Sequence, residues 1–160
     1  MAVNAPILNA VDTISGGEAE CYMVANGKRT WLMNATKVTA TYTKKKNEIR
    51  VLGSRTSRHK NNGGEGTGTM SFFYNSSAFR KMMQDYKESG VDTYFEMYIT
   101  NNDSTSSVGR QTTRLEGVNL DSIIVAMFDV DQDGALVEDV PFTFDDWYLM
   151  EEFAEIDRMV

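Results

Sequence analysis

Polar and apolar side chains alternate along most of this chain with a period of two residues. In residues 35–43, Val38 is flanked by threonines and a lysine, and in residues 93–100 Phe95 and Met97 alternate with polar neighbours. Alternation places every second side chain on the same side of an extended strand, so each segment can bury one face. Threonine and tyrosine also favour the pleated, half-buried surface of a sheet. The pattern therefore predicts a mainly β fold.

Turn signals separate such segments along the chain. Asn26-Gly27 is typical of a two-residue hairpin turn, because both central positions of that turn require a positive φ. Pro141 argues for an edge or a bulge in the last strand, because proline cannot donate a ladder hydrogen bond. The expected strands cover residues 18–24, 28–32, 35–43, 66–74, 93–100, 111–120, 123–129 and 137–144.

One segment, residues 76–89, has the period of an α-helix instead. Its apolar residues, from Phe79 to Tyr86, fall at positions i, i+3, i+4 and i+7, which is one face of a helix. Gly90 follows as a helix stop. This apolar stripe favours packing on a sheet over a ligand pocket. The elements together predict an antiparallel β-sandwich or small barrel with one flanking helix.

Length and composition favour one domain and exclude several classes of protein. The 160 residues carry 16 Lys and Arg against 23 Asp and Glu, which argues against a general nucleic-acid binder. Cys21 is the single cysteine, so no intrachain disulfide forms, and we expect it to be a small buried side chain. No apolar run reaches membrane-spanning length, and residues 1–11 lack the pattern of a secretory signal. We expect a chain made in the cytoplasm, without membrane insertion of the monomer.

A long cationic loop at residues 44–66 stands out in this acidic chain. A loop of this length is usually functional or disordered. Its basic residues are Lys44, Lys45, Lys46, Arg50, Arg55, Arg58, His59 and Lys60. They could bind nucleic acid or another anion, but no aromatic residue interleaves them to stack bases. We favour a second copy of the chain as the partner, because its acidic surface is complementary in charge. The candidate counter-surface is Asp145, Asp146, Glu151 and Glu152.

Two segments flank the expected β domain, which covers residues 18–146. Residues 1–17 are weakly patterned and predict a flexible N-terminal arm. Residues 147–160 are acidic and amphipathic, and predict a C-terminal tail that is either a short helix or extended and docked.

The sequence offers one alternative of another class, a small calcium- or ligand-binding β module. Asp129, Asp131, Asp133 and Gly134 match the start of an EF-hand loop. Position 12 of that loop should be a bidentate glutamate and is Val140, and a hairpin turn explains the same residues. His59 is the single histidine, which excludes paired-histidine metal sites. No pattern of catalytic residues or cofactor binding is present, so we expect no enzyme and no cofactor.

Five stretches carry a resemblance to a known family. They are Asn9–Glu20, Glu48–Arg55, His59-Lys60, Gly66–Thr69 and Glu138–Asp146. In combination they resemble the tail-tube proteins of contractile phages, of PBSX-like defective prophages and of related contractile bacteriocin particles. The resemblance covers residues 9 to 147.

The resemblance implies a virion structural protein that assembles with itself. Six copies would form a ring, and rings would stack into a hollow tube, with the 44–66 loop reaching the adjacent ring. A sheath protein would lie outside, a tape-measure protein or DNA in the lumen, and baseplate and terminator proteins at the ends. Sheath contraction would drive the tube through the cell envelope. The chain would be located in the tail of the phage or phage-like particle.

Overall fold

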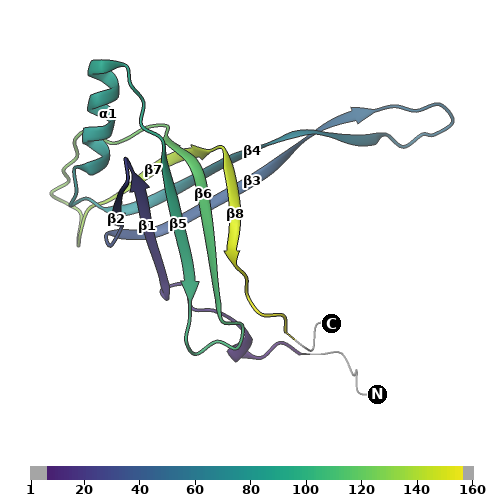
Figure 1. Cartoon of the computed structure of the whole chain (residues 1–160), viewed down its shortest axis with the longest axis horizontal. Helices are drawn as coiled ribbons and strands as arrows, with labels where there is room; N and C mark the ends of the chain where they lie inside the picture. Colours follow the sequence, from purple (N-terminus) through teal and green to yellow (C-terminus); the bar gives the residue numbers. More distant parts are fainter. Residues whose placement is uncertain (1–6, 157–160) are drawn as a thin grey trace. The chain divides into compact units, whose positions relative to one another are not determined.

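The computed structural model describes residues 7–156 and is mainly antiparallel β-sheet with one α-helix (Figure 1). This confirms the predicted fold class. In chain order the elements are the 3-10 helix η1 (Ala10–Asp12), β1 (Ala19–Ala25), β2 (Lys28–Trp31), β3 (Ala35–Ile49), β4 (Arg58–Phe73), α1 (Ala78–Ser89), β5 (Phe95–Asn102), β6 (Arg110–Leu120), β7 (Val137–Phe144) and β8 (Asp146–Glu151). Of the residues described, none belongs to a helix with the length and hydropathy needed to span a bilayer.

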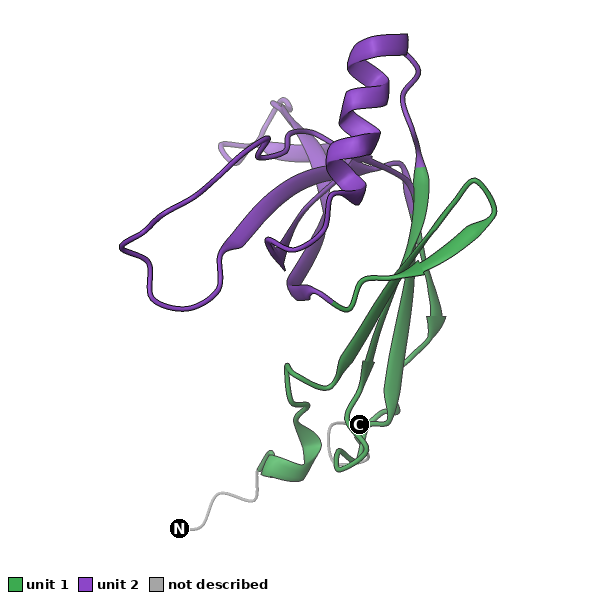
Figure 2. Ribbon diagram, turned by 90° about the vertical axis from the view of Figure 1, so that its left-hand side faces the viewer, with its two compact units in different colours: residues 1–33, 95–116, 147–160 green, residues 34–94, 117–146 purple. Residues whose placement is uncertain are grey.

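The chain divides into two compact units (Figure 2). Unit 1 comprises residues 1–33, 95–116 and 147–160, and unit 2 comprises residues 34–94 and 117–146. In unit 1 the strand order is β2-β1-β5-β6, and β8 also pairs with β6. In unit 2 the order is β6-β7-β4-β3. Strand β6 therefore contributes residues to both units of one eight-stranded sheet.

Unit 1 buries one face of its sheet and leaves the other half exposed. Met23, Met97 and Leu115 lie on neighbouring strands and form the buried face. On the other face, Tyr22 stacks on Tyr98 with ring centroids 4.7 Å apart. The alternation of apolar and polar residues in these strands reflects these two faces. The predicted turn at Asn26-Gly27 is confirmed, since both residues have a positive φ.

Unit 2 packs helix α1 against its sheet. Phe79 of the helix stacks on Phe72 of β4, with ring centroids 5.1 Å apart, and both rings are buried. The predicted helix stop is also confirmed, because Gly90 adopts the left-handed conformation and its N–H donates to the Tyr86 carbonyl. The predicted helix therefore forms and covers the sheet as the apolar stripe indicates.

A buried ion pair fastens α1 to strand β7. The guanidinium of Arg80 donates to the Glu138 carboxylate at 2.8 Å, where the Glu138 side chain is 4% exposed. The same guanidinium lies over the Tyr74 ring, 4.2 Å from its centroid. The Nε atom of Arg80 is buried and has no hydrogen-bond partner within the described residues.

Two segments differ from the sequence prediction, and a third takes one of its two expected forms. Residues 123–129 are irregular rather than a strand, and their apolar side chains Val125 and Phe128 are exposed instead of covering a sheet. Residues 147–151 of the expected tail are extended and docked, since they belong to strand β8, which pairs with β6. The 44–66 segment, expected as a loop, is largely paired strand, because β3 continues to Ile49 and β4 begins at Arg58. Backbone pairing stabilises a strand there without an apolar face.

Candidate assembly surface

The cationic segment forms the end of a long β-hairpin. Strand β4 pairs with β7 from Phe73 as far as Gly66. Strand β4 pairs with β3 along nearly its whole length, and residues 58–65 of β4 pair with β3 alone among the described strands, with Thr43 opposite Glu65 and Ile49 opposite Arg58. We call residues 43–65, with their connecting loop at residues 50–57, the long hairpin. In Figure 1 it extends away from the end of unit 2 where α1 lies. A two-stranded ribbon of this kind buries little and is marginally stable alone.

Aromatic rings cover the glycines at the base of the long hairpin. Gly66 and Gly68 stand opposite Phe144 and Phe142 of β7. A Cβ at Gly68 would overlap the Phe142 ring and the backbone carbonyl oxygen of β3 that faces it, and a Cβ at Gly66 would overlap the Phe144 ring. These glycines are therefore required for close packing. The sequence signal for this role is their spacing of two residues, which places them on one face of a strand.

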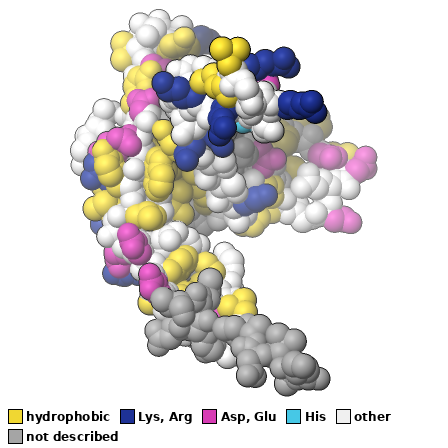
Figure 3. Space-filling view, turned by 90° about the vertical axis from the view of Figure 1, so that its right-hand side faces the viewer, with side chains coloured by type: hydrophobic (Ala, Val, Ile, Leu, Met, Phe, Trp, Pro, Cys, Tyr) yellow, Lys and Arg dark blue, Asp and Glu magenta, His cyan; other side chains and the backbone are white. Residues whose placement is uncertain are grey.

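The basic residues predicted to form a contact surface lie along the long hairpin and are exposed. Lys44, Lys45 and Lys46 are on β3, Arg50 and Arg55 are in the loop, and Arg58, His59 and Lys60 are on β4. Figure 3 shows the Lys and Arg side chains gathered at this end of the molecule. Lys45 pairs with Glu65 at 3.2 Å, but both side chains are more than half exposed, so the pair contributes little. The structure therefore presents a cationic surface at the end of the hairpin.

An apolar group lies at the centre of this cationic surface. Leu52 is fully exposed and Val51 is 40% exposed, both in the loop of the long hairpin. Arg50 and Arg55 flank them in the sequence. Leu52 is not among the contact residues predicted from the sequence, although an apolar residue inside a polar loop is a signal of such a contact.

The four acidic residues of the candidate counter-surface belong to different units. Asp145 and Asp146 are in unit 2, and Glu151 and Glu152 are in unit 1. Glu151 accepts a hydrogen bond from Arg110 at 2.7 Å. That hydrogen bond, followed by the charge of Glu151, raises the pKa of the Arg110 guanidinium above its ordinary value. Glu151 is thus engaged within the subunit, although the pair is half exposed and open to exchange.

An open apolar groove lies in unit 1, between the segments that approach the two ends of the chain. Its volume is about 670 Å³. Its lining residues are Asp12, Thr13, Ile14, Val108, Phe153, Ala154, Glu155 and Ile156. One wall is held by backbone pairing, since the Ala154 N–H donates to the Val108 carbonyl at 2.7 Å.

Hydrogen bonds to Asp103 hold the other wall of this groove. The Asp103 carboxylate accepts from the Thr105 hydroxyl at 2.6 Å and from the Ser15 N–H at 2.9 Å. These bonds, that of the Thr105 hydroxyl first, hold the pKa of Asp103 below its ordinary value of 3.8. Part of the expected N-terminal arm is therefore bonded to unit 1, whereas residues 1–6 lie outside the described residues.

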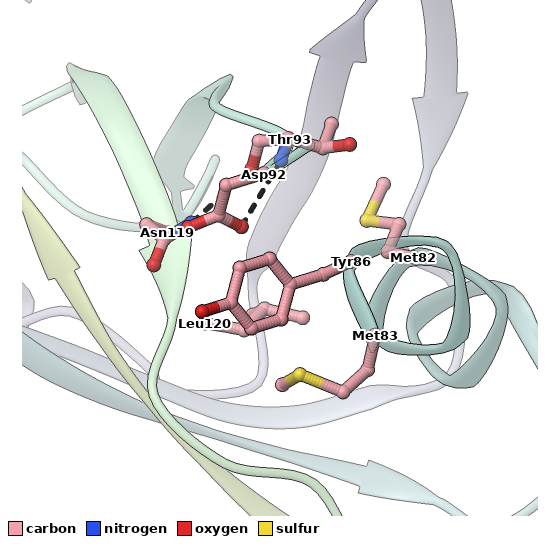
Figure 4. A pocket seen from close by; sticks show the side chains of 7 residues that line it. All are labelled: Met82, Met83, Tyr86, Asp92, Thr93, Asn119 and Leu120. Carbon is pink, nitrogen blue, oxygen red and sulfur yellow. Dashed lines mark hydrogen bonds between the residues drawn. The ribbon is translucent and has the colours of Figure 1, made fainter. Parts of the chain in front are cut away.

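A second hollow beside α1 is too small for an organic ligand (Figure 4). It lies between Tyr86 of the helix and the segment that carries Thr93, whose carbonyl accepts from the Asn119 side chain at 3.4 Å. Its volume of about 10 Å³ leaves room for one water molecule at most. Phe79 of the α1 stripe packs on the sheet as the sequence predicts, whereas Met83 and Tyr86 also line an open groove of about 540 Å³ together with Val125.

The aspartates of the calcium alternative lie in an exposed irregular segment. The Asp131 N–H donates to the Asp129 carboxylate at 3.0 Å, which forms a local turn. The sequence predicts the tip of a hairpin here, but the turn lies in an irregular segment and does not connect two adjacent strands. Across residues 7–156, no three His, Cys, Asp or Glu side chains gather in a way that could hold a metal ion. The calcium alternative has no support in this geometry.

Comparison with known proteins gives matches along nearly the whole chain. A family model described as phage tail tube protein matches residues 7–151. The protein XkdM of the phage-like element PBSX of Bacillus subtilis (strain 168) is 36% identical over 148 residues, covering 92% of this chain and 97% of that protein. The uncharacterized protein YqbM of the same strain is 37% identical over 145 residues, covering 91% and 95%.

Solved structures share the fold at low sequence identity. A chain of the anti-feeding prophage baseplate, symmetrised six-fold, has a TM-score of 0.63 at 10% identity, covering 92% of this chain and 97% of that chain. A chain of the sheath–tube complex of an extracellular contractile injection system, PVC, in the extended state has a TM-score of 0.65 at 9% identity, covering 86% and 91%. The SPP1 tail tube gives 0.58 at 10% identity, covering 92% and 83%.

Proposed function

The chain belongs to the phage tail tube protein family, and from that membership we propose that it is a structural subunit of the inner tail tube of a contractile injection particle. The observation that carries the proposal is the family match over residues 7–151, which includes nearly all described residues. In this role the protein is a building block rather than an enzyme. Stacked rings of it form a hollow conduit, which sheath contraction drives through the cell envelope.

Exposed strand edges support assembly into closed rings. Strand β3, Ala35–Ile49, lies at the end of its sheet and among the strands of residues 7–156 pairs with β4 alone, so its outer edge has no ladder partner within the described residues. A long exposed edge in a monomer is a template for pairing with another chain, and closure of a ring removes such edges. The proposed ring has six subunits, in line with the six-fold symmetry of a baseplate structure that contains a similar fold.

The charge distribution supports stacking of rings. Residues 44–60 hold seven Lys and Arg against one Glu, a net charge of +6. Because the whole chain has a net charge of −7, the rest of the chain carries −13. Opposite charges on two different surfaces favour a head-to-tail contact, and such a contact extends into a filament when it does not close. In this proposal Lys44–Lys46, Arg50, Arg55 and Arg58–Lys60 contact acidic surface of the next ring, including Asp145, Asp146, Glu151 and Glu152.

Further partners follow from a place in a tail. A sheath protein covers the outside, baseplate and terminator proteins occupy the ends, and a tape-measure protein or DNA fills the lumen. A lumen lined by the acidic remainder of the chain holds DNA weakly, because its phosphates find few cationic partners there.

Negative-stain electron microscopy of the purified protein at rising concentration tests the proposal. Hollow rods or six-fold rings are expected, with or without calcium. A protein that stays monomeric even when seeded with rod fragments, and whose melting temperature rises sharply with calcium, would instead favour the module built on Asp129, Asp131 and Asp133.

A charge reversal tests the stacking contact separately. The triple variant Arg55→Glu, Arg58→Glu and Lys60→Glu should form rings or monomers with the wild-type fold but no rods. The matched control reverses three exposed lysines outside the long hairpin, Lys28→Glu, Lys81→Glu and Lys87→Glu, which changes the net charge equally. Rods of wild-type length from the first variant would refute the contact.

A further inference from the structure

The end of the long hairpin combines an exposed apolar side chain with surrounding positive charge. Leu52 is fully exposed, and Val51 beside it is 40% exposed. Arg50 and Arg55 lie on either side in the loop, and both are exposed. Burying a leucine removes apolar surface from water and is favourable, so a projecting leucine on a charged surface is typical of an interaction site.

The groove of unit 1 has the complementary properties. Ile14, Val108, Phe153, Ala154 and Ile156 give it an apolar floor of a size that admits more than one side chain, in a volume of about 670 Å³. The charged residues that line it, Asp12 and Glu155, are both acidic. Exposed Glu152 precedes Phe153 in the same wall. An apolar side chain flanked by two arginines therefore matches an apolar groove lined by two carboxylates.

We propose that Leu52 of one subunit inserts into this groove on a second copy of the chain, with Arg50 and Arg55 placed against Asp12 and Glu155. The inference rests on the proposed tube function and specifies the partner surface of the long hairpin. Leu52 and the groove lie on different surfaces of the same chain, so the contact is head-to-tail and repeats without closing. Each ring thus offers a groove for the next ring's hairpins.

Cross-linking between two variants tests the contact directly. One subunit carries Leu52→Cys and the other carries Ala154→Cys, so a disulfide between the new cysteines joins two chains. The native Cys21 does not interfere because it is partly buried and poorly ionised, and Cys21→Ser in both chains removes it altogether. Mixed under mild oxidant in rod-forming conditions, the pair should give a covalent dimer on a non-reducing gel. A matched pair in which Val125→Cys, an exposed position of unit 2, replaces Leu52→Cys should not.

A second measurement reports the strength of the contact. Leu52→Asn should raise the protein concentration needed for rods by about 10- to 100-fold, the effect of exposing one leucine at the contact. Val125→Asn, at a position that is also exposed, should leave that concentration unchanged.

The outcomes separate this inference from the tube proposal. Rods that form without the Leu52–Ala154 cross-link, and at an unchanged concentration for Leu52→Asn, would overturn the insertion of Leu52 into the groove while supporting the tube. In that case the terminal residues of the chain itself would be the next candidate to occupy the groove. Seeded wild-type protein that forms neither rings nor rods would overturn the tube function itself.

Discussion

The ion pair between Arg80 and Glu138 gives the sharpest test of how the fold is stabilised. In Arg80→Met the methionine keeps much of the arginine's volume but removes its charge. The Glu138 carboxylate, 4% exposed, then loses the guanidinium that lies 2.8 Å away. Removing one partner of a buried pair costs about 3–5 kcal/mol, a large share of the 5–15 kcal/mol that typically stabilises a domain.

Urea unfolding of the unassembled subunit measures this cost. With a denaturant dependence of about 2 kcal/mol per molar urea, the midpoint should fall by roughly 1.5–2.5 M. Circular dichroism at 222 nm is the appropriate signal, because α1 lies in unit 2 whereas Trp31 and Trp147 both lie in unit 1. Arg110→Met is the control, since its pair with Glu151 is half exposed and its loss should barely move the midpoint.

A double variant decides whether the cost arises from the unpaired charge. Arg80→Met with Glu138→Leu removes both charges and also the buried Nε atom that lacks a partner. Replacing a buried pair by apolar residues is often neutral, so the double variant should lie within about 1 kcal/mol of the wild type. An Arg80→Met midpoint that shifts no more than that of Arg110→Met would refute the reasoning. A double variant that is as unstable as Arg80→Met alone, or less stable, would also refute it.

Three further predictions concern sites elsewhere in the chain. Gly68→Ala should lower the unfolding free energy by about 1–3 kcal/mol in urea titrations, because its methyl group overlaps the Phe142 ring, and an unchanged midpoint would contradict the packing described. Burial raises the pKa of the Cys21 thiol from 9.0 to about 12. Alkylation of Cys21 at pH 8 should therefore be about a thousand-fold slower in the native than in the urea-unfolded chain. The free energy of unfolding should also fall as the pH rises above 9, because the thiol ionises more readily in the unfolded chain. The lowered pKa of Asp103 contributes stability above pH 3.8, and this stability is lost as the pH falls through the lowered value. Hydrogen-exchange protection of the Ser15 amide, which donates to Asp103, should therefore persist at pH 4 and disappear only in stronger acid. Loss of this protection at pH 5 would argue against the hydrogen bond.

The elements that the sequence predicted well are those with one buried face. Strand β7 buries every second side chain up to Phe144, and helix α1 buries Phe79 and half-buries Met82 and Met83, so the periods of 2 and 3.6 are visible in the sequence. The turn at Asn26-Gly27 was equally clear, because few residues adopt a positive φ.

The long hairpin was interpreted as a loop because neither of its faces is buried. Its strands are stabilised by backbone pairing, which leaves no hydrophobic period in Lys44–Ile49 or Arg58–Glu65. The opposite error arose at residues 123–129, where an apolar run predicted a strand that finds no ladder partner. The groove could not be predicted from the sequence, since residues 12–14, Val108 and residues 153–156 are distant in the chain and are brought together by the Ser107–Val11 and Ala154–Val108 backbone hydrogen bonds. A tertiary site of this kind has no local pattern.

The long hairpin is a lever fixed at one end, where Gly66 and Gly68 pack against the rings of Phe144 and Phe142. We call this packing the clamp. Between Gly68 and Arg58 the strand spans roughly 30 Å at about 3.3 Å per residue. A rotation of about 5° at the clamp therefore displaces the free end by nearly 3 Å, by leverage along this length. The orientation of Leu52 and its flanking arginines therefore depends on two glycines at the opposite end of the hairpin. A single methyl group at the clamp would change the alignment of the tip without touching it.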